Sequence, residues 1–542
     1  MTIDEDAKML RHRLALSVFL GFSACPVMAS ETAAASDTPL ALAPALPDDT
    51  PLDIERQAQS GAPVTNMADA LGLAYWTNPT LLAQRSALKS VDYRVPQARA
   101  AYGPKLNFEL TYGITRSGTR TPGKAWSDGT SRSATATAIL TQPLFTFGRN
   151  AAGERYAMAQ LEYQREVLRS AEQQALLDAI VAYIGLLRDR ASVAITRDNL
   201  ATLERELSDN RARLARHEVT STDVQQVETR IELGRAQLYT AQRDAAASEA
   251  GFLQAIGGPA GVLSPPPPLN LPVRTLEEAY AYAETHSPVL LASQQREKTS
   301  RASVESVKAD LMPRVDLRGQ ADYTNGWDVR SIFGTLPRQD QRDLRGEVVV
   351  SGPIFESGLR QARVGEAQAA NDADWRLIDA ALRENRSTLA SAWADWRAQS
   401  AAIDRLALAV VAAKSAYDGA LLQEKAGLRT TLDVLDLARE LLLTRSNYNS
   451  AIAGAYAAQA RVLAAMGALE QSWLLPQAKR YDEEQHYNKV RKRGDIPFLT
   501  PVVRALDGAP LGGHRDRALR DPAAPLVTPE VALDPVKELP VP

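Results

Sequence analysis

Residues 139–148 read Ile-Leu-Thr-Gln-Pro-Leu-Phe-Thr-Phe-Gly, and the rest of the chain is organised around this stretch. Its first four residues are strand-like, and Gly148 then opens a helix-like segment that extends to about His217 without a proline. At ~1.5 Å per residue, such a helix would be on the order of 100 Å long. Because helices of globular proteins average about three to four turns, this length is not typical of an ordinary core.

The same arrangement recurs in the second half of the chain, which indicates an internal repeat. Residues 350–358, Val-Ser-Gly-Pro-Ile-Phe-Glu-Ser-Gly, open a second helical run that extends to Ala426. The prolines that interrupt the two halves also correspond, Pro79 with Pro288 and Pro104 with Pro313. For each half we therefore predict the order helix, strand, strand, long helix, turn, helix.

Composition excludes several classes of function. Charged residues make up 23% of the chain and the formal net charge is −3, so no nucleic-acid partner is indicated. The single cysteine, Cys25, excludes a disulfide framework and a cysteine-based metal site. The five histidines are scattered, and no Ser/His/Asp signature, P-loop or GxGxxG motif is present. We therefore expect no enzymatic activity, no cofactor and no metal.

Residues 1–29 have the pattern of a secretory signal peptide. Basic residues precede an apolar stretch at 14–22, which is too short to span a bilayer as a helix, and Val27-Met28-Ala29 offers a cleavage site. A lipoprotein signal is the alternative, because residues 22–25, Phe-Ser-Ala-Cys, loosely resemble a lipobox, although Phe22 and Pro26 fit it poorly. Both interpretations predict export.

Changes in composition divide the remaining chain into segments. We predict a flexible arm at 30–65, a first repeat at 66–257, a proline-rich linker at 258–274, a second repeat at 275–467, a mixed C-terminal segment at 468–499 and a disordered Pro- and Ala-rich tail at 500–542.

Two strands are predicted in each repeat from the alternation of apolar and polar residues. The segments are 106–114 and 133–142 in the first repeat and 315–323 and 344–350 in the second, with loops at 117–132 and 325–341. About nine residues is the length that a tilted transmembrane strand needs. Alternation alone does not distinguish such a strand from a half-buried hairpin in a soluble domain.

The long helices carry a seven-residue apolar spacing, which predicts packing along a neighbouring helix in a coiled-coil manner. The positions are Leu382, Leu389, Trp396, Ile403, Val410 and Tyr417 in the second repeat, and Val193, Leu200, Leu207 and Leu214 in the first. At the first turn, Thr222 with Gln225 resembles a capping box, and Asp223 lies in the first turn of the returning helix.

The four strands of one chain cannot close a membrane barrel, and lipid does not tolerate an open sheet edge. If the strands span a membrane, copies must combine, and three copies would supply twelve strands, which lies within the range of outer-membrane barrels. The predicted fold is mixed α/β, mainly long α-helices. If the strands span a membrane, the fold is a trimeric 12-stranded barrel whose long helices project into the periplasm as a helical tunnel.

At this point the chain resembles TolC-type outer-membrane efflux proteins over about residues 66–470. The resemblance is carried by both strand-to-helix junctions, by Gln142-Pro143-Leu144-Phe145 with Gly148-Arg149 and by Gly352-Pro353-Ile354-Phe355 with Gly358-Leu359. It is also carried by Glu172-Gln173-Gln174, Asp178-Ala179, Ala182-Tyr183, Leu187-Arg188-Asp189 and Thr222-Asp223-Val224. The junctions most resemble the branch that serves type I protein secretion.

The resemblance implies a homotrimeric exit duct in the lipid of the outer membrane of a Gram-negative-type envelope, with a periplasmic extension. It further implies a periplasmic adaptor and an inner-membrane ABC or RND-type pump as partners. The cargo would be protein or small molecules. Drug efflux by a proton-driven pump is the alternative to type I secretion, and a soluble exported coiled-coil scaffold is a further one.

The resemblance also implies a pore gate at the periplasmic tip, in residues 427–436. Asp433 and Asp436 would form acidic rings and Arg429 would help to latch the closed state, while Thr222, Asp223, Gly427 and Thr430 would form the tip turns that dock the adaptor. Asp433 follows Thr430 by three residues, so helix capping is the alternative role for it.

Two residues depart from the family pattern at the tips. His217 stands where the family often has glycine, and Glu424 stands where it often has an aromatic residue. The departure at His217 affects the turn that is expected to dock the adaptor. From the departure at Glu424 we expect the closed state to be held by different hydrogen bonds.

Overall fold

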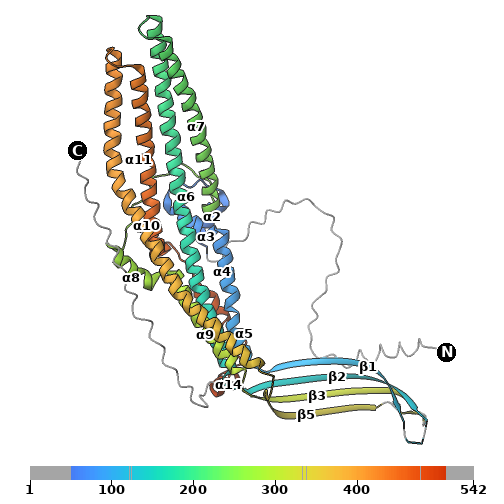
Figure 1. Ribbon diagram of the computed structural model, residues 1–542. Helices are drawn as coiled ribbons and strands as arrows, with labels where there is room; N and C mark the ends of the chain where they lie inside the picture. The colour runs from blue at the N-terminus through green and yellow to red at the C-terminus, as the bar shows by residue number, and fades with distance from the viewer. Residues whose placement is uncertain are drawn as a thin grey trace, which may run out of the picture. The chain divides into compact units, whose positions relative to one another are not determined.

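The computed structural model describes residues 50–507, apart from residues 121, 124, 332–333, 337–338 and 476–477. The described elements all belong to one compact unit (Figure 1). The predicted signal peptide with Cys25, the first part of the predicted arm and the tail beyond residue 507 lie outside the described residues.

The described elements follow the repeated order expected from the sequence. In chain order they are α2 (Leu52–Ser60), α3 (Met67–Thr77), α4 (Pro79–Asp92), α5 (Arg94–Ala100), β1 (Lys105–Thr119), β2 (Ser127–Phe145), α6 (Arg149–Ala215), α7 (Ser221–Ile256), α8 (Leu276–His286), α9 (Pro288–Ala309), β3 (Arg314–Ser331), β4 (Gly334–Leu336), β5 (Gln339–Ser351), α10 (Leu359–Lys425), α11 (Thr431–Met466), α12 (Gln471–Leu474), α13 (Glu483–Val490) and α14 (Leu499–Asp507). The predicted mainly helical fold with two strand hairpins in two repeats is confirmed.

The two long helices, α6 and α10, have 67 residues each. Both begin after two consecutive residues with positive φ, Phe147 and Gly148 in the first repeat and Ser357 and Gly358 in the second. A positive φ is uncommon for a residue other than glycine, so the same unusual junction in both halves is a feature of the repeat. No helix in the described part of the chain is long and apolar enough to cross a membrane.

The seven-residue apolar stripes face other helices, as the spacing predicted. In α10 all six positions are buried or half-buried, with Leu389 and Tyr417 the most completely covered. The helix α11 packs along α10, and α7 packs along α6, so each repeat forms a long helical hairpin (Figure 1). The largest core lies where α3, α4 and part of α11 cover the middle of α6.

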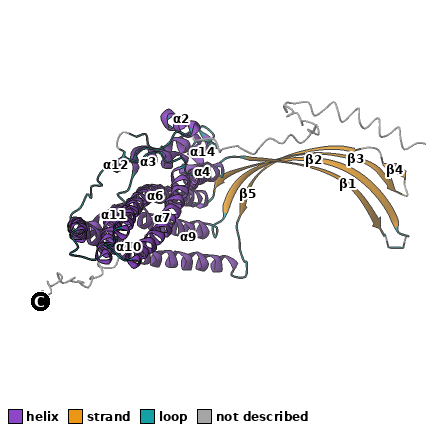
Figure 2. Ribbon diagram, turned by 90° about the horizontal axis from the view of Figure 1, so that it is seen from above, coloured by secondary structure: helices purple, strands orange, loops and turns teal. Residues whose placement is uncertain are grey.

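The strands form one antiparallel sheet in the order β1-β2-β3-β5, and the short strand β4 pairs with the far end of β3. The sheet is arched and leaves the helices at one end (Figure 2). Its register places Leu110 opposite Ala136, Ala136 opposite Tyr323, and Phe108 opposite Ala138. Because opposite residues in a ladder point to the same side, the apolar positions of all four long strands share one face.

That face is exposed, although it is made of large apolar side chains. Phe108 and Leu344 each expose 88% of their surface, and Leu110 exposes 74%. The opposite face is polar and internally bonded: the Thr137 hydroxyl donates to Asp322 at 2.7 Å, and Arg318 lies 3.7 Å from Glu347. A sheet with one apolar exposed face and one polar face has the pattern of a membrane barrel wall, apolar outside and polar inside.

The strands are longer than the sequence predicted. The loops expected at 117–132 and 325–341 are largely strand, because the β1–β2 ladder continues to the pair Thr119–Ser127 and the β3–β5 ladder to Gly326–Gln339. Polar residues rich in Thr and Ser extend the hydrogen-bonded ladder beyond the apolar alternation, which is the only part that the sequence pattern detects.

The segments predicted to be a flexible arm and a disordered tail each contain a helix, so these predictions were wrong in part. The predicted arm includes α2, and Val64 pairs with Ala260 of the predicted linker. The predicted tail includes α14, whose Thr500 and Val503 are each 3% exposed. These short segments are ordered because they pack against distant parts of the chain, which local composition does not reveal.

The last residue of α14, Asp507, caps the start of α6. One of its carboxylate oxygens accepts hydrogen bonds from the Thr146 amide and hydroxyl, both at 2.7 Å, and from the Gly148 amide at 3.2 Å. The other accepts from the Ala151 amide at 3.4 Å. An acid at this position also interacts favourably with the dipole of the long helix.

Replacing Leu110 by arginine should prevent stable insertion of the sheet, because a charged side chain on a lipid-facing position costs about 2–4 kcal/mol near the middle of the bilayer. The measurement is the free energy of unfolding in urea from phosphatidylcholine vesicles. Thr111→Arg places the same charge on the polar face and is the control, for which we expect a much smaller loss. Equal losses in both variants would contradict the assignment of the two faces.

Replacing Asp507 by alanine should loosen the start of α6, because charge-assisted hydrogen bonds are worth about 1.5–3 kcal/mol. We expect hydrogen exchange of the amides of residues 146–151 to accelerate roughly tenfold or more. Asp482→Ala removes the capping aspartate of α13 and should leave these amides unchanged. Unchanged exchange in Asp507→Ala would show that the cap contributes nothing.

Candidate functional site

The tips of the two helical hairpins end in the same hydrogen-bonded turn. At the first tip the Glu218 amide donates to the Arg213 carbonyl at 3.0 Å, and at the second the Leu428 amide donates to Gln423 at 2.8 Å. This is the Schellman arrangement, which needs a residue in the left-handed region just after the helix. Gly427 occupies that position with φ 73°, and His217 occupies it at the first tip with φ 59°.

His217, in place of the glycine that the family often has, therefore keeps the same turn geometry but at a conformational cost. A residue with a Cβ pays about 1–2 kcal/mol to enter the left-handed region, which glycine avoids. The first tip keeps the geometry of the second in spite of this cost.

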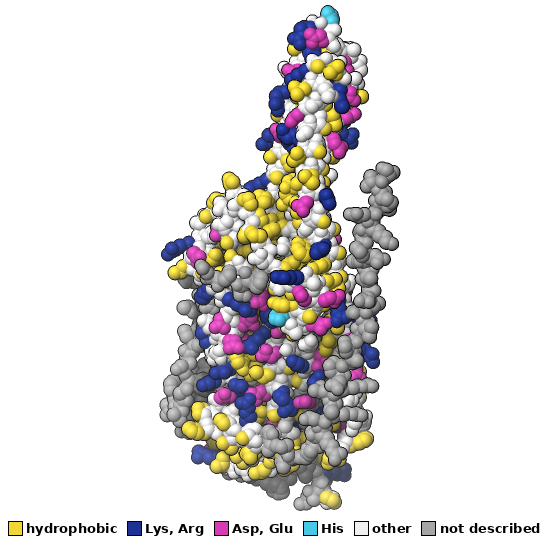
Figure 3. Space-filling view, turned by 90° about the vertical axis from the view of Figure 1, so that its left-hand side faces the viewer, with side chains coloured by type: hydrophobic (Ala, Val, Ile, Leu, Met, Phe, Trp, Pro, Cys, Tyr) yellow, Lys and Arg dark blue, Asp and Glu magenta, His cyan; other side chains and the backbone are white. Residues whose placement is uncertain are grey.

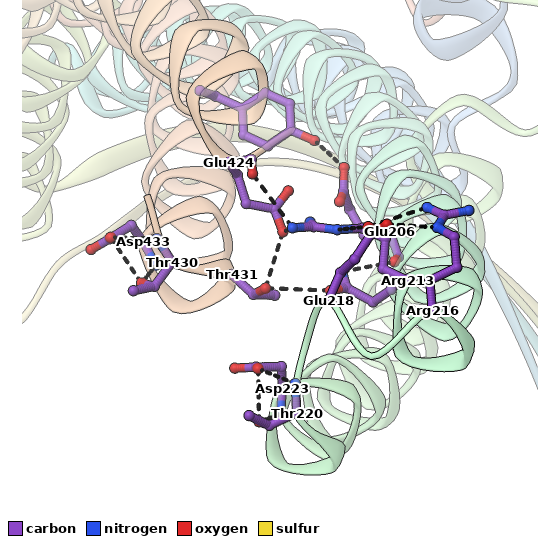
Figure 4. Close-up of polar contacts among 12 residues, drawn as sticks. Glu206, Arg213, Arg216, Glu218, Thr220, Asp223, Glu424, Thr430, Thr431 and Asp433 are labelled. Carbon is purple, nitrogen blue, oxygen red and sulfur yellow. Dashed lines mark hydrogen bonds and ion pairs between the residues drawn. The ribbon is translucent and has the colours of Figure 1, made fainter. Parts of the chain in front are cut away.

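Both returning helices begin with a complete capping box. Thr220 caps α7 together with Asp223, and Thr430 caps α11 together with Asp433 (Figure 4). The predicted capping pair of Thr222 with Gln225 was wrong: the helix begins at Ser221, and Thr222 is an exposed residue in its first turn. Asp223 does lie in the first turn, as expected.

The Asp433 carboxylate is thus engaged at the helix start while remaining open to solvent. It accepts hydrogen bonds from the Thr430 hydroxyl at 2.8 Å and from the Thr430 amide at 3.1 Å. These bonds, with a smaller contribution from the Arg429 charge, hold the pKa of Asp433 below its usual value in a single chain. Capping therefore keeps Asp433 ionised and fixed in direction, which is compatible with a further role.

Asp436 lies one turn further along α11 and connects the two hairpins. Its carboxylate accepts a hydrogen bond from Arg230 of α7 at 2.9 Å. The Asp436 side chain is 60% exposed, so the ion pair itself adds little stability. Within the described part of the chain, Arg429 has no hydrogen-bond or ion-pair partner.

Glu424 forms the main polar contact between the hairpins. It is 3% exposed, and its carboxylate accepts a hydrogen bond from Arg213 of α6 at 2.7 Å (Figure 4). The Thr431 hydroxyl lies 3.0 Å from the same oxygen and 3.3 Å from the Asn210 side-chain oxygen. A buried carboxylate needs such partners, because an unpaired buried charge is strongly unfavourable.

A second acid lies beside this contact. The Tyr417 hydroxyl is 3.5 Å from Glu206, and both groups are buried. Burial, with the nearby Glu424 and Asp209 charges, raises the pKa of Glu206. Burial and the Glu206 carboxylate raise the pKa of Tyr417 to about 12. The site therefore holds two acids, Glu206 and Glu424, between the hairpins, with Arg213 as the neutralising cation.

Apolar packing below the tip reinforces the contact. Leu435 of α11 packs into a cluster that is otherwise built from the first hairpin, namely Leu200, Leu203, Val227 and Ile231. The two hairpins are therefore joined by a polar contact at the tip and by an apolar one below it.

Sequence reasoning singled out Glu424 but missed its partners Arg213, Asn210 and Thr431, as well as Glu206 and Arg230. A usable signal was present, because polar residues at 206, 210 and 213 recur at helical spacing beside the apolar positions Leu207 and Leu214. Polar residues that border a packed stripe are candidates for interhelical contacts.

The arrangement offers hydrogen bonds and ion pairs between helices rather than a reactive centre. Among the described residues, no group of three or more His, Cys, Asp or Glu side chains could hold a metal ion. What the site can do is hold two hairpins together or release them.

Comparisons with known proteins agree with this geometry. The family described as "Outer membrane efflux protein" matches residues 70–258 and 279–468, one match in each repeat. The chain is 28% identical to outer membrane efflux protein BepC of Brucella suis, over 79% of this chain and 91% of that protein. It is 25% identical to alkaline protease secretion protein AprF of Pseudomonas aeruginosa, over 69% of this chain and 78% of that protein.

The fold also matches solved structures. The outer membrane channel CmeC of Campylobacter jejuni superimposes with a TM-score of 0.64 at 13% identity, over 80% of this chain and 90% of that chain. Because the family match covers well over half of the chain and both repeats, this protein belongs to the outer membrane efflux protein family and is an export channel of the Gram-negative outer membrane, not an enzyme.

Proposed function

We propose that three copies of this chain form the exit duct of a tripartite export system. The observation that carries the proposal is the open sheet: β1 and β5 are its outer long strands, and among the described strands each is paired on one side only. Within lipid the unpaired backbone groups of these edges need partners. Pairing β5 of one copy with β1 of the next satisfies both edges, and three copies close twelve strands.

The helices support the same assembly. Large apolar side chains on α10 remain exposed in the single chain, including Leu408 and Val411, which each expose 65% of their surface. Hydrophobic side chains gather on one face of the helical region below the charged tip (Figure 3). Such a surface is suited to contact with the hairpins of neighbouring copies.

The tip would be the gate of this duct. Asp433 and Asp436 share one side of α11, and in a trimer their six carboxylates would form two acidic rings. Converging carboxylates raise one another's pKa, which opposes the lowering by the helix cap in a single chain. The contact of Arg213 with Glu424 would hold the closed state, and the unpartnered Arg429 would be available for contacts with a neighbouring copy.

A periplasmic adaptor would dock at the tip turns around Thr222, Asp223, Gly427 and Thr430, and an inner-membrane pump would supply the energy. We favour protein secretion, since the relative AprF is a protease secretion protein and the junctions resemble that branch. Drug efflux is the second candidate, favoured by the relative BepC, which is an efflux protein. A deletion strain separates the two by loss of secreted protein or by increased drug sensitivity.

The purified protein in a planar bilayer should give small, cation-selective conductance steps that divalent cations block. Asp433→Ala/Asp436→Ala should lose both the selectivity and the block, because the acidic rings are removed. Asp418→Ala removes an exposed carboxylate of α10 outside the proposed rings and serves as the control. Unchanged selectivity in the double variant would contradict the assignment of the gate but not that of the duct. An absence of conductance steps from the wild type would contradict the duct itself.

Arg213→Ala should favour the open duct, because it leaves Glu424 buried without its cation, a change that typically costs about 3–5 kcal/mol. We expect larger or more frequent conductance steps than in the wild type. Adding Glu424→Gln to Arg213→Ala removes the unpaired charge and should restore much of the closed state, since coupled residues do not behave additively. Conductance that is the same in all three proteins would show that this contact does not hold the closed state.

A further inference from the structure

The apolar face of the sheet ends in arginines at the end away from the helices. In β1, the apolar positions up to Ile114 are followed on the same face by Arg116. In β2, Arg132 lies opposite Ile114, and in β5, Arg342 lies opposite Tyr323. All three arginine side chains are exposed. We call Arg116, Arg132 and Arg342 the arginine rim.

The position of Arg116 in the rim matches the boundary of a bilayer. From Leu106 to Arg116 the chain advances by ten residues, or ~33 Å along a strand, and ~23 Å in height if the strand is tilted by about 45°. The apolar band of outer-membrane barrels is ~25 Å tall. Arg116 therefore lies where the acyl chains end, at a depth where an arginine costs only about 0–1 kcal/mol.

Aromatic residues lie on the same face near the rim. Tyr112 and Tyr323 lie close to the rim, and the Arg342 guanidinium is 5.8 Å from the centre of the Tyr323 ring. Tyrosine prefers the boundary between acyl chains and headgroups, because its ring is apolar and its hydroxyl is polar. The rim therefore presents guanidinium groups on the lipid-facing side of the sheet, with Arg116 at the depth of lipid headgroups.

The rim is also more basic than acidic in the described side chains. Asp340 lies on this face, where it accepts a hydrogen bond from Asn325 at 2.5 Å. Arg116 and Arg132 make contacts within the protein as well. A guanidinium has five N–H donors, so one such contact leaves donors for a second partner.

We propose that the arginine rim binds the phosphate groups of an anionic glycolipid in the outer leaflet of the outer membrane. Guanidinium and phosphate form paired, charge-assisted hydrogen bonds with well-defined geometry. The acyl chains of such a lipid would lie along the apolar face while its phosphates reach the rim. The inference rests on the proposed placement of the sheet, with its hairpin ends outside and its helices in the periplasm.

The opposite face supplies a matched comparison. Arg318 and Arg345 lie in the same sheet, on the polar side, with Arg318 facing Glu347 across the β3–β5 pair. Removing these two arginines changes the charge of the sheet without changing the lipid-facing side.

The test measures binding of fluorescent lipid A that carries two phosphates to the full-length processed protein in detergent, against the same lipid after enzymatic removal of its phosphates. We expect the wild type to prefer the phosphorylated form by about tenfold or more. Arg116→Gln/Arg132→Gln/Arg342→Gln should reduce the preference to less than about twofold, while Arg318→Gln/Arg345→Gln should retain it. Inorganic phosphate at the concentration of the lipid should not compete.

Equal binding of the two lipids by the wild type would overturn the proposal, as would a triple variant that keeps the full preference or competition by free phosphate. If the triple variant does not fold, Arg132→Gln alone should lower the preference at least threefold, and an unchanged value would again contradict the rim. Conductance of the variants is recorded in parallel, so a duct that conducts without lipid preference separates failure of this inference from failure of the proposed duct.

Discussion

The constraint on which the rest of the structure depends is the hydrogen bonding of the two sheet edges. Each backbone amide and carbonyl that enters lipid must find a partner, and a sheet of four long strands leaves an unpaired row on β1 and another on β5. A soluble protein could cover such edges with a loop or a charged side chain. Here the face between the edges is apolar and exposed, and in the proposed trimer another copy of the same sheet would pair with each edge.

The way in which the sheet closes would also determine the positions of the helices. In the proposed trimer each chain would contribute two helical hairpins, through junctions with the same unusual backbone at Gly148 and at Gly358. The spacing of the strands around a barrel then sets where the hairpins emerge. Contacts between hairpins, such as Arg213 with Glu424, must form within that arrangement, and they are the contacts that can change without disturbing the sheet.

Local patterns in the sequence were enough to predict the repeat, the strands, the long helices and their packed stripes, because each depends on spacing along a short segment. Contacts between distant segments were not predictable in this way. Asp507 caps Thr146 across 361 residues, and Arg213 meets Glu424 across 211 residues. Choosing Thr220 rather than Thr222 as the cap of α7 also depended on where the preceding turn at His217 ends. Such choices are decided by the folded geometry.

The long helix of the first repeat is buried along more of its length than the long helix of the second, and this difference bears on which hairpin would move. The helix α6 has buried residues along most of its length, from Ala152 to Asn210, and its first turn is capped by Asp507. The described buried residues of α10 begin only at Leu389. We expect the second hairpin to be the one that moves, because within the chain it has fewer buried contacts to lose. In the proposed trimer, neighbouring copies would add contacts to both hairpins.

At the tip, a displacement of the second hairpin would break only a few contacts. Displacing α10 and α11 from α6 separates Glu424 from Arg213 and Leu435 from its apolar cluster, while the helix caps of both hairpins remain intact. An adaptor or pump can shift the equilibrium only by binding the displaced arrangement more tightly than the closed one. In the proposed gate the Glu424 pair would favour the closed arrangement, because separating Glu424 from Arg213 leaves a buried carboxylate without its cation.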